Sequence, residues 1–132
     1  MGVRLCYFIL LASLWSPGAP RRNRDKPPEV EVFEASARRM EGQVNVDARV
    51  RNCGEKPIKR LMVLFDFMDP DRQVITTKRW EDEEHEALDP GDDVQIRARV
   101  VDPVRAVEIQ LRFEDAEGRG LRPKESKPFP IE

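Results

Sequence analysis

Apolar and polar residues alternate along most of this chain, and the densest apolar run outside the amino terminus is residues 58–70. Every second residue in the middle of this run is apolar, which is the period of a β-strand with one buried face. We predict a central strand that ends at residues 69–72, where a proline flanked by aspartates favours a turn. The side chains predicted to face the core are Leu61, Val63, Phe65 and Phe67.

Similar alternation predicts further strands on both sides of the central one. They are expected at residues 29–37, 41–51, 74–81, 94–100 and 107–113, with a short seventh strand at 121–126. We expect the strand at 41–51 to form a hairpin with the central strand across the turn at 52–57. Seven short strands without a helical period predict an all-β fold, an immunoglobulin-like antiparallel β-sandwich; a small Greek-key barrel fits the same pattern.

The first 28 residues differ from the rest of the chain. Arg4 precedes an apolar stretch of eleven residues, 5–15, which is too short to cross a bilayer and is typical of a signal peptide. We predict a signal peptide over 1–18, a flexible basic tether over 19–28 and one domain over 29–132. The protein is then exported to the periplasm or the extracellular space. An uncleaved membrane anchor is the alternative, because four basic residues follow the apolar stretch.

The charge pattern narrows the class of partner. Charged residues make up 36% of the chain, its net charge is −2, and opposite charges are interleaved along the predicted strands. This pattern argues against a nucleic-acid partner, because a polyanion is held by an excess of positive charge. A chain cleaved after residue 18 would keep Cys53 alone of its two cysteines, so we expect a passive thiol and a fold stabilised by its hydrophobic core.

Candidates for catalytic chemistry are few. His85 is the single histidine, and the predicted mature chain has two serines, Ser36 and Ser126, neither of them near it in sequence. Nucleophilic catalysis needs a hydroxyl or thiol beside a base. We therefore predict that the protein is not an enzyme and uses no cofactor.

An acidic segment at residues 81–93 is the main candidate for a metal site. It holds eight carboxylates and one histidine in thirteen residues, and such oxygen and imidazole groups bind calcium or transition metals. The spacing matches no metal-binding loop motif, so a solvated acidic surface is the other interpretation. The candidate ligands are Glu83, Glu84, His85, Glu86, Asp89, Asp92 and Asp93.

Five arginines at outward positions of the predicted strands are candidates for binding an anion. If their strands were neighbours, they would form a stripe suited to an anionic glycan or a lipid headgroup. Asp47, Glu108 and Glu114 are interleaved with them, which also allows a face of internal ion pairs. The five residues are Arg49, Arg51, Arg97, Arg99 and Arg112.

The central strand carries Met62 and Leu64 at positions where the other strands are polar. A sandwich of two sheets has no third layer to cover these side chains, and exposed apolar patches commonly mark docking sites. We predict either a partner-binding patch at Met62 and Leu64 or a cover made by the first strand, by Trp80 or by residues 129–131.

Four short motifs occur within residues 44–114: Arg51-Asn52, Pro57-Ile58, Phe65-Asp66-Phe67-Met68-Asp69 and Leu88-Asp89-Pro90-Gly91-Asp92. They give this segment a resemblance to the FxLYD-type and related bacterial immunoglobulin-like modules of envelope proteins. This resemblance implies an exported, non-enzymatic module and supplies no catalytic residues. We therefore expect a protein-interaction or assembly module of the cell envelope with a protein partner, and membrane attachment only if the amino-terminal segment is uncleaved. The alternative is a metal-binding domain that uses residues 81–93.

Overall fold

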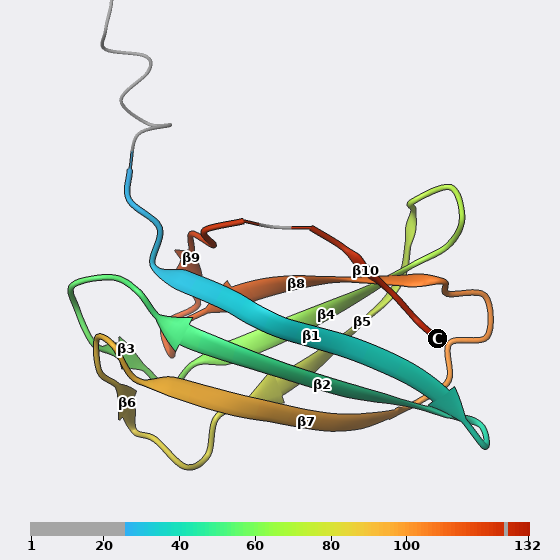
Figure 1. Ribbon diagram of the computed structural model, residues 1–132, viewed down its shortest axis with the longest axis horizontal. Helices are drawn as coiled ribbons and strands as arrows, with labels where there is room; N and C mark the ends of the chain where they lie inside the picture. The colour runs from blue at the N-terminus through green and yellow to red at the C-terminus, as the bar shows by residue number, and fades with distance from the viewer. Residues whose placement is uncertain (1–25, 126) are drawn as a thin grey trace, which may run out of the picture.

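The computed structural model describes residues 26–125 and 127–132, which form two antiparallel β-sheets packed face to face (Figure 1). One sheet has the strand order β1-β2-β7. In the other sheet the order is β10-β8-β4-β5, and β9 also pairs with β8. The strands of the first sheet are β1 (Val30–Met40), β2 (Gln43–Asn52) and β7 (Asp93–Val101). Those of the second are β4 (Met62–Met68), β5 (Val74–Glu81), β8 (Glu108–Glu114), β9 (Gly120–Leu121) and β10 (Phe129–Pro130).

The core lies between the two sheets, as the alternation predicts. The four inward residues predicted on the central strand segment are all fully buried, and β4 pairs with a strand on each side. The opposite sheet contributes the alternate residues of β2 and β7. Because both sheets bury one face and leave the other facing outward, apolar and polar residues alternate along their long strands. From the first sheet, the buried apolar side chains are Val30 and Ala37 of β1, Val44, Val46, Ala48 and Val50 of β2, and Val94 and Ile96 of β7.

The central run does not continue as one strand from residue 58. Arg60 has a φ of 49°, a left-handed conformation that interrupts a β-strand. The two residues before it form β3 (Ile58–Lys59), which pairs with β6 (Ala87–Leu88) in a small separate sheet. The alternating pattern is compatible with an unbroken strand, so it gave no sign of this break.

The predicted hairpin across residues 52–57 is wrong. β2 and β4 lie in different sheets, so the connection crosses from one layer to the other. β1 and β7 pair with the two edges of β2, so neither edge is left for β4. Asn52 is fully buried at the end of β2. Its backbone N–H donates to the carbonyl oxygen of Asp92 at 3.0 Å, and its carbonyl oxygen accepts from the N–H of Gly91 at 2.8 Å. Asn52 is thereby fixed to the loop before β7.

The turn at residues 69–72 is confirmed. Asp69 Oδ1 accepts hydrogen bonds from the backbone N–H groups of Asp71 and Gln73 at 2.9 and 3.0 Å. Arg72 has a φ of 64°, and its N–H donates to the carbonyl of Asp69 at 2.8 Å. The Asp69 side chain therefore holds the turn through local backbone hydrogen bonds, and after this turn β5 runs antiparallel to β4.

The carboxyl-terminal segment closes one side of the sandwich (Figure 1). The predicted seventh strand is shorter than expected, since β9 ends at Leu121, and Ser126 lies outside the described residues. Pro123 cannot donate a ladder hydrogen bond, and it makes an isolated bridge to Val30 of β1 instead. β10 pairs with β8, and Ile131 bridges to Ala37. These contacts link the two sheets along the β1 edge.

Candidate functional site

The outward face of the β1-β2-β7 sheet carries four of the five predicted arginines. Arg49 and Arg51 project from β2, and Arg97 and Arg99 project from the neighbouring β7. Their register neighbours on β7 and β2 are Gln95, Asp93, Asp47 and Asn45, respectively. The structure therefore brings these four residues together on one surface, which we call the arginine face.

Phe33 adds an aromatic side chain to the arginine face, and the sequence analysis missed it. β1 has a bulge between Val32 and Glu34, where Phe33 is the extra residue. Such a bulge re-aims a side chain, and Phe33 is 39% exposed. The guanidinium carbon of Arg51 lies 5.0 Å from the centre of the Phe33 ring, and that of Arg49 lies 6.0 Å away. Both distances are within cation–π range.

Ion pairs neutralise part of the arginine face. Arg97 Nε lies 3.7 Å from Asp47 Oδ1, and Arg51 Nη2 lies 4.0 Å from Asp93 Oδ2. These exposed pairs contribute little stability, about 0–1 kcal/mol each. Among the residues that the structure describes, Arg99 makes no ion pair. The buried Nε of Arg49 has no hydrogen-bond acceptor within the same part of the chain. Of these two arginines, Arg99 is the one whose guanidinium is exposed and available to a ligand.

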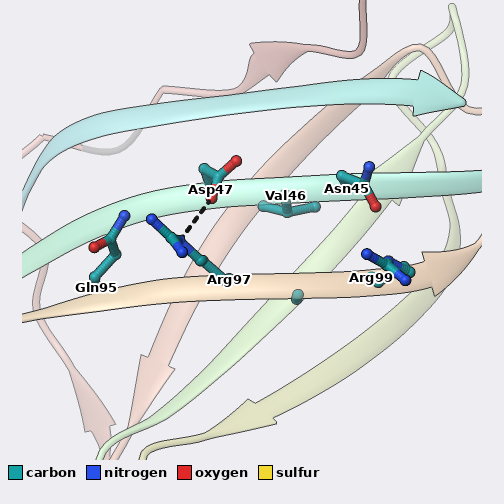
Figure 2. A pocket seen from close by; sticks show the side chains of 7 residues that line it. Asn45, Val46, Asp47, Gln95, Arg97 and Arg99 are labelled. Carbon is teal, nitrogen blue, oxygen red and sulfur yellow. Dashed lines mark ion pairs between the residues drawn. The ribbon is translucent and has the colours of Figure 1, made fainter.

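A shallow depression of about 670 Å³ lies along β2 and β7 (Figure 2). Arg97 and Arg99 line it from β7, and Asn45 and Asp47 line it from β2. Asn45 Oδ1 is buried there without a donor among the described groups. An open, mixed-charge depression of this kind suits part of a protein surface better than an enclosed small molecule.

Arg112 does not belong to the arginine face, so the predicted stripe of five is wrong at this position. It lies on β8 of the other sheet, opposite Leu64 of β4. Its Nε and Nη2 donate to the two carboxylate oxygens of Asp66 at 2.5 and 2.9 Å, and Thr77 Oγ1 donates to Asp66 Oδ1 at 2.7 Å. Asp66 is 6% exposed, and the charge of Arg112 offsets the cost of burying it.

The hydrogen bonds from Arg112 lower the pKa of Asp66 below its ordinary value of 3.8, and Thr77 adds to this effect against the opposing effect of burial. A carboxyl whose pKa is lower in the folded state stabilises the fold above the unfolded pKa, and it loses this contribution as the pH falls through the folded value. We expect Asp66→Asn to cost about 1–2 kcal/mol at pH 7, because Arg112 is half exposed and the pair is partly screened. The difference in unfolding free energy between the natural protein and Asp66→Asn should become smaller as the pH falls from about 5 to about 2.

Urea unfolding at a series of pH values measures this dependence. Asp71→Asn removes the same charge from an exposed turn position and serves as the matched control. A cost for Asp66→Asn that stays constant from pH 7 to pH 2, or that equals the cost for Asp71→Asn, would contradict the assigned role of the Asp66–Arg112 pair.

Met62 and Leu64 face outward on β4, as predicted, but both are half-buried. Their partners on the two neighbouring strands are charged: Glu81 of β5 and Glu114 of β8 flank Met62, and Arg79 of β5 and Arg112 of β8 flank Leu64. The three covers proposed from the sequence lie elsewhere. Trp80 packs against the core opposite Val63, and the β1 and 129–131 segments close the side of the sandwich. The patch therefore has little apolar surface, and its role in binding stays a prediction.

The predicted metal ligands do not converge. Within residues 26–125 and 127–132, no group of three or more potential metal-ligating side chains is close enough to hold an ion. His85 Nδ1 lies 2.9 Å from Asp82 Oδ2, while Asp82 Oδ1 accepts from the N–H groups of Glu84 and His85 at 3.0 and 3.3 Å. Asp82 is 1% exposed. The acidic segment is thus arranged around one buried aspartate that orders its backbone.

The groups considered for catalysis are also separate. Ser36 lies on the outward face of β1 opposite Asp47, whereas His85 lies in the loop after β5 of the other sheet. Cys53 is exposed, but neighbouring groups partly shield its thiol from water, and this desolvation raises the pKa of the thiol. The negative charge of Glu31 raises the pKa further. At neutral pH this thiol is protonated and a weak nucleophile.

Comparisons with known proteins bear on the fold alone. No protein-family model matches this sequence, and no curated protein matches it. Among solved structures, a β-glucuronidase from glycoside hydrolase family 2 is similar over 78% of this chain, with 9% identity and a TM-score of 0.53. The match covers 13% of that enzyme's chain, so this chain corresponds to a small part of it.

Two smaller proteins are similar over nearly their whole length. IrmA from Escherichia coli is 12% identical, with a TM-score of 0.48, and the match covers 78% of this chain and 97% of that one. An immunoglobulin-like protein from Pseudomonas aeruginosa is 17% identical, with a TM-score of 0.35 and coverage of 82% and 94%. The chain is an all-β protein with an immunoglobulin-like antiparallel β-sandwich, as the sequence predicted.

The predicted signal peptide lies outside the described residues. In the part of the chain that is described, no helix has the length and apolar character needed to cross a membrane. The backbone hydrogen bonds of the sandwich begin at Glu29, whose N–H donates to the carbonyl of Arg122 at 2.7 Å.

Proposed function

We propose that this chain is a non-catalytic protein-interaction module of the cell envelope, and that its partner contacts the arginine face. The observation that carries the proposal is Phe33, which a bulge holds on that face with Arg49 and Arg51 beside its ring. Aromatic residues and arginine are enriched at the energetic centres of protein interfaces. Here the two residue types occur together on an outward sheet face.

The balance of charge favours a protein over a polyanion as the partner. Five arginines and four carboxylates project from the outward face of the sheet, so the surface is nearly neutral overall. A nucleic acid or a sulfated glycan is held by an excess of positive charge and the release of counterions. A protein surface with an apolar group for Phe33 and carboxylates for the free guanidinium donors fits better. The arginines are Arg38, Arg49, Arg51, Arg97 and Arg99, and the carboxylates are Glu31, Glu34, Asp47 and Asp93.

The non-catalytic part of the proposal is supported by the separation of the reactive groups. His85 is engaged by Asp82, Ser36 lies on the other sheet, and the raised pKa of Cys53 disfavours a thiolate. The location is proposed from the sequence of residues 1–18, which has the features of a signal peptide. Membrane attachment applies if that segment is uncleaved.

A capture experiment tests the proposal. The chain, with a cleavable tag after Glu132, is cross-linked in an envelope extract of the producing organism. We expect one protein to be captured saturably by the natural sequence and to be lost with Phe33→Ser combined with Arg51→Glu. Both positions are exposed or half-exposed, so the melting temperature should change by only a few degrees.

Met62→Ser with Leu64→Ser is the comparison variant, because it alters the outward face of the other sheet. If this variant still captures the partner, the result supports binding of the partner to the arginine face. If this variant is folded like the natural protein but does not capture the partner, the partner docks on Met62 and Leu64 of β4 instead. Salt-sensitive retention on heparin would indicate an anionic ligand and would also contradict the proposal.

A further inference from the structure

The two sides of the sandwich are closed to different degrees. Along one side, the carboxyl-terminal segment bridges β1 of one sheet and β8 of the other. On the opposite side, β5 and β7 are the last strands of their sheets, and among the described residues no strand pairs with their second edges. Figure 1 shows β7 as the lower edge of the front sheet. An open edge exposes backbone N–H and C=O groups that can pair with another strand.

The two open edges are not equivalent. β5 has a bulge in its pairing with β4, and it carries Lys78 next to Arg79; bulges and lysines are features that protect an edge from pairing. β7 pairs with β2 in an unbroken register over its nine residues, and it contains neither lysine nor proline. Its edge is therefore long and regular, and its charged residues, Asp93, Arg97 and Arg99, are of both signs.

The sequence of β7 is complementary to itself. When two copies of an antiparallel strand pair about a two-fold axis, opposite residues lie on the same face of the sheet. With the axis at Ile96, Asp93 of each copy lies opposite Arg99 of the other, and Gln95 lies opposite Arg97. On the buried face, Val94 lies opposite Ala98. Opposite charges thus meet at both ends of the paired strands.

Other registers are less suitable. A shift of one residue would place core residues opposite outward ones. An axis at Arg97 would place the two copies of that arginine opposite each other, and an axis at Gln95 would pair a shorter part of the strand. The charges and the paired length together select the register centred on Ile96.

We propose that a second copy of this chain pairs along the free edge of β7, making a continuous six-stranded sheet across the dimer. In this arrangement Asp93, which lies 4.0 Å from Arg51 of its own chain, faces the Arg99 that has no ion pair within the described part of the chain. The dimer places two arginine faces side by side on one sheet.

Sedimentation equilibrium of the full chain, over a range of concentrations and at two salt concentrations, tests the proposal. We expect a reversible dimer that weakens as salt screens the exposed pairs. Arg99→Asp places like charges opposite each other twice per dimer and should raise the dissociation constant by about tenfold or more. Asp93→Arg should act in the same direction. The double variant, Asp93→Arg with Arg99→Asp, should restore dimerisation to within about threefold of the natural sequence, because the opposite charges are exchanged.

Arg38→Asp is the matched control, since it changes the net charge equally on the same sheet face but lies on β1, two strands from the β7 edge. We expect it to leave the dissociation constant unchanged. Should Arg99→Asp fail to fold, Arg99→Gln removes the charge alone and should weaken the dimer by about threefold. A monomer at every concentration, equal weakening by Arg38→Asp, or a double variant that stays dissociated would overturn the proposal.

Discussion

Replacing Phe65 with alanine is expected to lower the free energy of unfolding by about 3–5 kcal/mol. Phe65 is fully buried at the middle of β4, with Leu111 opposite it on β8 and Lys78 opposite it on β5. Truncation removes buried apolar surface and leaves a cavity. Because β4 is paired on both sides, it cannot shift to fill that cavity. Since domains of this size are stable by about 5–15 kcal/mol, the loss is a large part of the total.

Urea unfolding followed by tryptophan fluorescence measures this loss. Phe33→Ala removes the same side chain from an exposed position, and we expect it to cost less than about 1 kcal/mol. If Phe65→Ala melts within a few degrees of the natural protein, Phe65 does not occupy the centre of the core.

Substitution of Asn52 is expected to have the second largest effect, about 2–4 kcal/mol for Asn52→Ala. The fully buried side chain donates from Nδ2 to the carbonyl oxygens of Lys56 and Leu88, both at 2.8 Å. Its Oδ1 accepts from the N–H of Gly54 at 2.9 Å. Alanine leaves these three backbone groups without their partner, and the carbonyl of Leu88 loses a hydrogen bond that is buried.

Asn52→Asp separates the loss of hydrogen bonds from the loss of volume. It keeps the shape of the side chain but places a carboxylate against two carbonyl oxygens, so at pH 7 we expect it to destabilise at least as strongly as alanine. Asn45→Ala, at a half-buried outward position of the same strand, serves as the control. Equal unfolding midpoints for the Asn52 and Asn45 variants would show that Asn52 does not join the two loops.

The motif residues that carry the resemblance to FxLYD-type modules have structural roles in this chain. Asn52 and the loop at residues 88–92 meet through backbone and side-chain hydrogen bonds. Phe65 and Phe67 fill the core, and Asp66 between them pairs with Arg112 on the outward face. The resemblance is therefore explained by what the sandwich needs at these positions, and membership of that group stays a prediction.

Strand positions and their buried faces were predictable from sequence because alternation follows directly from burying one face of a sheet. β2 and β4 bury the residues that the pattern assigns to the core, and so does β8 from Ile109 onward. In β7 the inward Ala98 and Val100 are only half-buried, and Val107, which the pattern also assigns to the core, is exposed. The predictions that failed concern features that depend on contacts between segments far apart in the sequence. The hairpin across 52–57 is excluded because β1 and β7 pair with both edges of β2. The strand breaks at Arg60, and β3 pairs with β6, which lies far from it in sequence.

The candidate site was predictable only in part. Alternation places Arg49, Arg51, Arg97 and Arg99 outward, but strand order decides that they share one face while Arg112 lies on the other sheet. Phe33 could have been noticed, because a strict period starting at Val30 and Val32 would bury Glu34 and expose Ala35 and Ala37. A bulge at Phe33 restores the apolar face. The candidate metal ligands in residues 81–93 are close in sequence, but the fold does not bring three of them together in space.

A binding isotherm tests the role of the arginine face most directly. The captured partner is titrated against the natural protein and against Phe33→Ala, with Met62→Ser and Leu64→Ser as the comparison variant. If Phe33 is the anchor of the interface, Phe33→Ala weakens binding about 30-fold, which corresponds to roughly 2 kcal/mol, while the comparison variant binds like the natural protein. Equal affinities for the natural protein and Phe33→Ala, with both proteins folded, would contradict this account.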